Sequence, residues 1–147
     1  MPIIQNVSRH DVEVGRHHIP GENGAILIQI SDPDTAHPVP KHVFKKTYQF
    51  KFLDIEDDQV CLKEEWRPSQ DDAYDIVMAL EKALDAGMDV IVHCHMGVCR
   101  SGAVAEAGAI LGFQCLQRPH SPNSSLKRRL LEALDLSFDP SRSAFNE

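Results

Sequence analysis

The order of apolar and polar residues along the chain separates strands from helices. Residues 24–30 form an almost unbroken apolar run that turn residues end, which is typical of a buried strand. Residues 47–53 alternate bulky apolar and polar side chains, as a half-buried strand does. A short strand is also expected at 2–7, and residues 89–93 predict a buried strand that is central and parallel.

Three segments carry helical periodicity. Ser69 is a good N-cap and Gly87 a good stop for a helix between them. Its apolar positions at helical spacing are Ala73, Ile76, Val77, Leu80, Ala83 and Leu84. The Ala-rich segment Ser101–Leu111 suits a helix packed closely against a sheet, and residues 123–135 predict a final amphipathic helix. About the last twelve residues are expected to fray.

The order strand, helix, strand, loop, helix predicts an α/β fold with a central, mostly parallel sheet flanked by helices. A length of 147 residues fits a single domain spanning 1–147, with its core roughly at 2–135. In such sheets ligands bind beyond the carboxyl ends of the strands. The loop at 94–100 therefore stands at the expected binding position.

Composition narrows the possible partners. Apolar residues make up 42% and charged residues 25% of the chain, the balance of an ordinary globular protein. The formal charge of -7 makes nucleic acid and anionic membranes unfavourable partners, and we interpret Lys127, Arg128 and Arg129 as a solvated helix face. Because no apolar run reaches eighteen residues and the N-terminus does not resemble a secretory signal, we expect a cytoplasmic protein with free thiols.

The loop after the strand at 89–93 carries the chemistry. A loop curled over a helix N-terminus points its backbone N–H groups inward, which suits a tetrahedral dianion and should lower the pKa of Cys94. Arg100 can fold back and offer a planar fork to two phosphate oxygens, and Ser101 can donate its hydroxyl to the sulfur. Gly97 permits the tight turn. The sequence thus predicts a phosphate-binding loop between a central strand and a helix N-terminus, formed by His95, Met96, Gly97, Val98, Cys99 and Arg100.

At these residues the sequence resembles the protein tyrosine phosphatase superfamily, whose signature is His-Cys, five residues, Arg, then Ser or Thr. The matching residues are His93, Cys94, Gly97, Arg100 and Ser101. The segment 50–54, the helix before the signature and the stretch 118–123 resemble the compact dual-specificity and bacterial members. The resemblance covers roughly residues 24–135. It implies a cysteine-dependent phosphatase that acts through a phosphocysteine intermediate and needs no metal or other cofactor.

The resemblance also implies a general acid on a separate loop, because an alkoxide or phenoxide leaves poorly without a proton. The candidates are Asp54, Asp57 and Asp58. Asp54 is preferred because it stands where a strand ends, and Asp57 is the alternative. The resemblance further implies that His93 orients the loop and helps to set the thiolate pKa, without acting as a base. His95 fills a variable position at the mouth of the cleft.

The other cysteines are interpreted as structural. Cys99 fills a tight turn, with oxidative pairing to Cys94 as the less favoured hypothesis. Cys61 and Cys115 are expected to be inert, although Cys61 follows the acidic loop and is a second conceivable redox partner.

The same residues allow three rival functions. A metal site at His93, Cys94, His95 and Cys99 is disfavoured because adjacent strand residues point to opposite faces. Sulfurtransferases, arsenate reductases and low-molecular-weight phosphatases are disfavoured by the composition of the loop, the acidic loop and the late position of the cysteine. A catalytically weak phosphate- or phosphoprotein-binding module of the same fold stays as the alternative.

The substrate is the least determined part of the prediction. The loop interior at 95–99 has no Lys or Arg, which favours a phosphorylated protein or peptide over a highly charged inositol phosphate. Specificity for tyrosine alone or for serine and threonine as well, and the oligomeric state, stay open.

Overall fold

The computed structural model describes residues 2–56, 59, 63–116 and 122–137. Within them lies one five-stranded sheet in the order β3-β2-β4-β1-β5, in which every pairing is parallel. Its strands are β1 (Ile3–Ser8), β2 (Ala25–Ser31), β3 (Lys46–Lys51), β4 (Asp89–Cys94) and β5 (Gln114–Cys115). The predicted α/β fold and the central place of the strand before Cys94 are confirmed.

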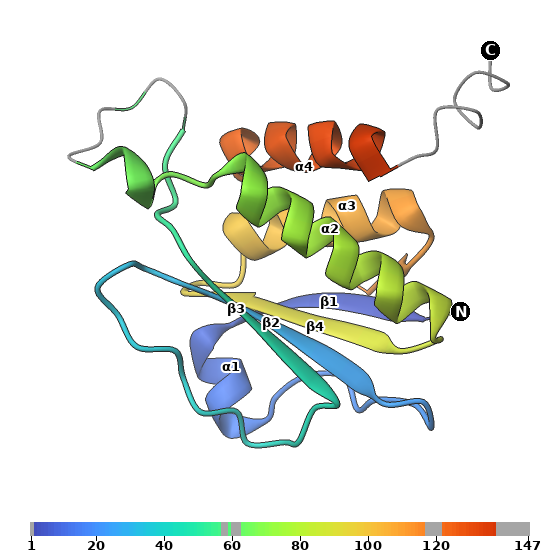
Figure 1. Cartoon of the computed structure of the whole chain (residues 1–147). Coiled ribbons are helices and arrows are strands. Elements are labelled where there is room, and N and C mark those ends of the chain that lie inside the picture. The colour runs from blue at the N-terminus through green and yellow to red at the C-terminus, as the bar shows by residue number, and fades with distance from the viewer. Residues whose placement is uncertain (1, 57–58, 60–62, 117–121, 138–147) are drawn as a thin grey trace, which may run out of the picture.

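Helices cover both faces of the sheet (Figure 1). One face carries α2 (Gln70–Asp85), α3 (Arg100–Leu111) and α4 (Ser124–Ser137), and the other carries the short α1 (Arg9–Val14). The sequence did not predict α1, the 3-10 helix η1 (Glu64–Trp66) or β5. These elements are short, and α1 buries only Val12, so no periodicity marks them.

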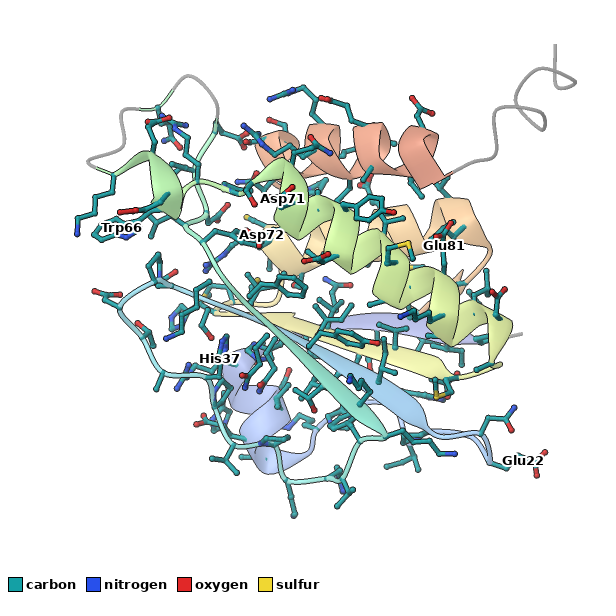
Figure 2. All side chains as sticks on the ribbon, in the orientation of Figure 1. Glu22, His37, Trp66, Asp71, Asp72 and Glu81 are labelled. Atoms are coloured by element: carbon teal, nitrogen blue, oxygen red, sulfur yellow. The ribbon has the colours of Figure 1, made fainter. Side chains whose placement is uncertain are left out.

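The ends of α2 follow the local sequence. The hydroxyl of Ser69 accepts a hydrogen bond from the backbone N–H of Asp72 at 2.9 Å, as the N-cap prediction requires. Asp71 and Asp72 lie at the start of the helix (Figure 2). Their carboxylates stabilise the helix there by interacting with the positive end of its dipole. Gly87, one residue beyond the C-cap, has φ +69°, a conformation that glycine adopts without strain.

Two apolar layers lie on the two faces of the sheet. The larger one fills the space between the sheet and α2, α3 and α4, and it includes Cys94. The smaller one joins Val7, Leu27 and Ile91 to Val12 of α1. Because side chains alternate along a strand, β4 directs Cys94 and the neighbouring His93 to opposite faces.

Some sequence predictions fall outside this description. The frayed C-terminal segment at 138–147, most of the acidic loop after Glu56, and residues 118–121 are not among the described residues. Within the described part of the chain, no helix is both long enough and apolar enough to cross a membrane.

Phe52 tests the connection between the core and the carboxyl edge of the sheet. Its side chain is fully buried in the larger layer. We expect Phe52→Ala to lower the free energy of unfolding by about 3–5 kcal/mol, because the cavity it leaves cannot fully collapse. Urea unfolding followed by circular dichroism measures this. Val43→Ala, at a side chain that is 95% exposed, should change the value by less than about 0.5 kcal/mol. A similar small loss in both variants would contradict the assignment of Phe52 to the core.

Candidate functional site

The segment 94–100, which we call the signature loop, connects the end of β4 to the start of α3. Three of its carbonyl oxygens accept hydrogen bonds from neighbouring elements. The pairs are His95 O with Arg9 N at 3.2 Å, Gly97 O with Asn6 Nδ2 at 2.8 Å, and Cys99 O with Asn123 N at 2.9 Å. The loop is therefore anchored on its outer side by β1, by the first residue of α1 and by the residue before α4.

These anchors determine where the amide groups of the loop point. A planar trans peptide directs its N–H opposite to its C=O. The N–H groups of Met96, Val98 and Arg100, which follow the three anchored carbonyls, therefore point away from the anchoring residues. Backbone amides at a helix N-terminus can bind an anion when they converge on one point.

Gly97 is required by a close approach of β1. Its φ is +77°, and a Cβ at this position would lie 2.4 Å from the backbone nitrogen of Ser8 and from the carbonyl carbon of Val7. Any other residue would force β1 and the signature loop apart.

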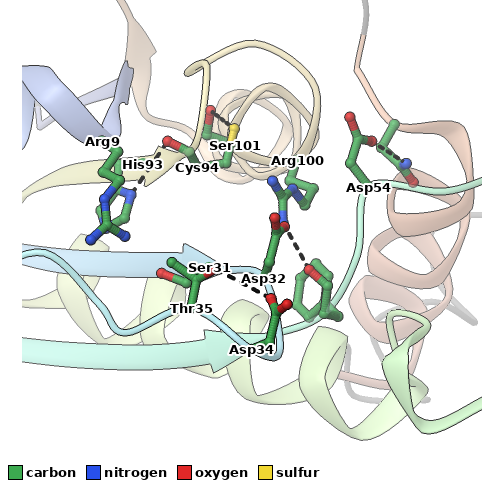
Figure 3. A network of polar contacts seen from close by, with 12 residues as sticks. Arg9, Ser31, Asp32, Asp34, Thr35, Asp54, His93, Cys94, Arg100 and Ser101 are labelled. Carbon is green, nitrogen blue, oxygen red and sulfur yellow. Dashed lines mark hydrogen bonds and ion pairs between the residues drawn. The ribbon is translucent and has the colours of Figure 1, made fainter. Parts of the chain in front are cut away.

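Cys94 and Ser101 face each other inside the loop (Figure 3). The Cys94 Sγ lies 3.2 Å from the Ser101 Oγ, and both side chains are buried. This is the contact that the sequence predicted for a hydroxyl that stabilises the sulfur.

Arg100 is buried, with its guanidinium anchored at one end. Its Nη1 donates to Asp32 Oδ1 and to the carbonyl oxygen of Phe52, both at 2.8 Å (Figure 3). Its Nε is buried and has no hydrogen-bond partner among the described residues. The fork is thus oriented by Nη1 while a donor stays unsatisfied. Asp32 was interpreted from the sequence only as a turn residue, and no local signal marks its ion pair.

Asp54 is held by a residue from the far end of the chain. Its Oδ1 accepts a hydrogen bond from Asn123 Nδ2 at 2.6 Å, and the same Nδ2 donates to the carbonyl of Ile55 at 3.0 Å. The Asn123 Oδ1 in turn caps α4 by accepting from the N–H of Leu126. From the sequence, Asn123 was expected to start a helix and to belong to the stretch 118–123 that resembles compact phosphatases, but its contact with Asp54 was not predicted. Asp57 and Asp58 lie outside the described residues.

Cys99 also contacts Asp54. Burial raises the pKa of the Cys99 thiol, and the adjacent Asp54 carboxylate, which hydrogen-bonds to it, raises that pKa further. Cys99 is therefore a neutral donor to the carboxylate at physiological pH. The interpretation of this residue as a filler of the turn misses that contact.

His93 is fully buried beneath the loop. Burial lowers the pKa of His93 from 6.5 to about 4, and the charges of Arg9 and Arg100 act in the same direction. Its Nδ1 lies 3.5 Å from the carbonyl oxygen of Cys94, a long contact, and its Nε2 has no partner among the described residues. His93 is therefore neutral at pH 7. His95 is exposed at the mouth of the loop, as predicted.

Side chains of the loop and of its surroundings line a cavity of about 300 Å³. Its walls include Cys94, Arg100, Asp54, Asp32 and Cys99. Among the described residues, no group of three or more His, Cys, Asp or Glu side chains is placed to hold a metal ion. The cavity therefore combines a thiol, a guanidinium and a carboxylate at the carboxyl edge of the sheet.

The arrangement can be compared with known proteins. No family model matches the sequence, and no curated protein matches it significantly. A crystal structure of human DUSP28 is similar to this chain with a TM-score of 0.57 at 15% identity, over 92% of this chain and 94% of that one. The chain has the fold of the dual-specificity phosphatases. A crystal structure of Tk-PTP in its active form gives a TM-score of 0.44 at 16% identity, over 92% of this chain and 80% of that one. At 15% identity, the similarity to the DUSP28 structure confirms the predicted resemblance for the fold alone.

The buried imidazole makes stability depend on pH. In the unfolded chain His93 takes up a proton near pH 6.5, whereas in the folded chain it does so near pH 4. Neutral His93 therefore makes its full contribution to the free energy of unfolding above about pH 6.5. This contribution falls, by up to about 3 kcal/mol, as the pH drops toward 4. We expect His93→Gln to reduce this slope in urea unfolding between pH 7 and 4. His10→Asn, which removes an exposed imidazole, should follow the wild type. An unchanged slope in His93→Gln would contradict the assignment.

Proposed function

We propose that this protein is a cysteine-dependent phosphomonoester hydrolase that acts through a phosphocysteine intermediate. The observation that carries the proposal is the state of Arg100. Its guanidinium is oriented through Nη1, yet its buried Nε has no acceptor among the described residues, in a cavity that Cys94 and Asp54 also line. A phosphate oxygen supplies the missing acceptor, and buried polar groups without partners are rare in folded proteins.

The first chemical step uses Cys94 as the nucleophile. Its thiolate attacks phosphorus in line with the leaving oxygen, so that an S–P bond forms as the O–P bond breaks. Arg100 and the amides of the signature loop stabilise the equatorial oxygens. Asp54 in its protonated form gives the leaving oxygen its proton.

The second step releases phosphate. The Asp54 carboxylate, now deprotonated, takes a proton from water as that water attacks the phosphocysteine. The S–P bond breaks, and the Ser101 hydroxyl at 3.2 Å donates to the departing sulfur. Inorganic phosphate leaves, and Cys94 and Asp54 return to their starting states. Asn123 and Cys99 act as positioning residues, because both contact the Asp54 carboxylate.

The substrate that we propose is a phosphorylated side chain of a protein or peptide, phosphotyrosine first and phosphoserine or phosphothreonine second. The interior of the loop carries no cation beyond Arg100, so the cavity itself matches a single phosphate. Met96, which is 71% exposed, stands at the mouth, where an aromatic ring would contact its thioether.

Replacement of the thiol tests the reaction. With para-nitrophenyl phosphate in EDTA and reductant, we expect the wild type to turn over and Cys94→Ser to lose activity by at least about a thousandfold, since a hydroxyl at this position is a far weaker nucleophile. Vanadate should inhibit the wild type, whereas EDTA should have no effect. Turnover by neither protein, with both folded, would favour a phosphate-binding module of the same fold. Equal turnover by both would mean that Cys94 is not the nucleophile.

Replacement of the carboxylate tests the general acid. Asp54→Asn should lower kcat by about 10²–10³ for a phosphotyrosine peptide, because the leaving phenoxide then departs without a proton. The loss should be smaller for para-nitrophenyl phosphate, whose leaving group needs a proton less. Asp71→Asn removes a carboxylate at the start of α2 and serves as the matched control with unchanged kinetics. An equal loss for both substrates would exclude Asp54 from protonating the leaving group.

A further inference from the structure

A second cavity adjoins the first at the same edge of the sheet. Its volume is about 250 Å³, and its walls include Arg9, Ser31, Thr35, His93, Asp32 and His95. Asp32 and His95 also line the first cavity, so the two are neighbours. Figure 3 shows Arg9 beside His93, on the opposite side of the Cys94 backbone from Ser101.

Arg9 is held in position by two different segments. Its backbone N–H donates to the carbonyl oxygen of His95, which ties it to the signature loop. Its Nη1 donates to the carbonyl oxygen of Ala36 at 2.7 Å, in the segment between β2 and β3. Arg9 therefore lines the second cavity while its guanidinium is held by the segment between β2 and β3.

Cationic side chains lie near this cavity, although the chain as a whole carries a formal charge of -7. Burial is the main cause of the lowered pKa of both His37 and His93, and Arg9 lowers both pKa values further. Lys51 acts on His37 and Arg100 acts on His93 in the same direction. Arg9, Lys51 and Arg100 are thus close enough to act on the imidazoles on this side of the sheet.

The polar groups of the walls favour an anion over a cation. The carboxylate of Asp32 is engaged by Arg100 at 2.8 Å, so its charge is compensated. The buried Nε2 of His93 has no partner among the described residues. Arg9 supplies planar N–H donors suited to a carboxylate or a phosphate.

We propose that the second cavity binds a second anionic group of the same substrate. Resting on the proposed function, this inference names the preferred substrate as a phosphopeptide with another phosphate, or a carboxylate, one or two residues from the phosphorylated side chain. Because the two cavities share Asp32 and His95, a phosphate in the first cavity and an anion in the second can come from neighbouring residues of one extended peptide. The signature loop contains no Lys or Arg before Arg100. Arg9 therefore supplies a positive charge from outside the loop.

The test uses phosphotyrosine peptides that differ at one flanking position, which carries phosphoserine, Glu or the neutral Gln. We expect the wild type to hydrolyse the phosphoserine peptide with a kcat/KM about tenfold above that of the Gln peptide, with Glu between them, at the flanking position that reaches the cavity. Four positions, two on each side, are scanned. Arg9→Ala should reduce the preference to less than about twofold, and Arg9→Lys should retain part of it. High salt should weaken it in the wild type.

Arg16→Ala is the matched control. Arg16 lies just after α1, is exposed and pairs with Asp11, so this variant removes one positive charge from the same part of the chain without touching the cavity. It should keep the full preference. An equal loss in Arg9→Ala and Arg16→Ala would overturn the site, because general charge would then explain the preference.

Binding separates failure of this inference from failure of the proposed function. Fluorescence polarisation with labelled peptides measures the affinity of Cys94→Ser, with and without Arg9→Ala. Suppose that the wild type hydrolyses para-nitrophenyl phosphate but shows the same kcat/KM for every phosphotyrosine peptide, whatever its flanking residue. That result would overturn the second site and leave the phosphatase proposal standing. If the wild type hydrolyses nothing, a binding preference lost in Arg9→Ala supports the second site alone, and equal affinities for all peptides overturn it.

Discussion

The structure depends on the buried guanidinium of Arg100. Burying a charge is costly unless it is paired and hydrogen-bonded. Its partners come from segments that follow two different strands, because Asp32 comes directly after β2 and Phe52 directly after β3. Arg100 can be satisfied only when β2, β3 and β4 have assembled in register, since α3 starts from the end of β4. The pairing therefore links formation of the sheet to orientation of the Arg100 guanidinium.

The alternation of side chains in β4 divides the carboxyl edge into two regions with different roles. Cys94 turns toward the face that α2, α3 and α4 cover, where it contacts Ser101 and lines one cavity with Arg100. His93 turns toward the other face, beside Arg9. One strand and one loop thus serve two adjoining cavities. In our proposals the first carries the reaction and the second contributes to the choice of substrate.

Most of the secondary structure could be predicted because its signals are local. The Ser69 cap and the apolar spacing of α2, and the unbroken apolar run of β2, each lie within one element. The short α1 could not be predicted, because it buries only Val12, and β5 has only two residues. Their places are set by packing against β1 and not by their own sequences. The preference for Asp54 among three aspartates also rested on position alone, since nothing near it in the sequence reveals Asn123 as its partner.

The sequence by itself determined the relation between Cys94, Arg100 and Ser101, because a strand, a tight turn at Gly97 and a helix place residues at this spacing around one point. Only the tertiary structure decided which groups complete the site. Asp32 and Asn123 lie 68 and 69 residues from the partners they hold, and Asn6 lies 91 residues from the carbonyl of Gly97 that it anchors. Arg9 likewise joins the site only because β1 pairs with β4. Such contacts follow from strand order and register, which depend on burial of the whole sheet. The spacing of residues within one element therefore cannot predict them.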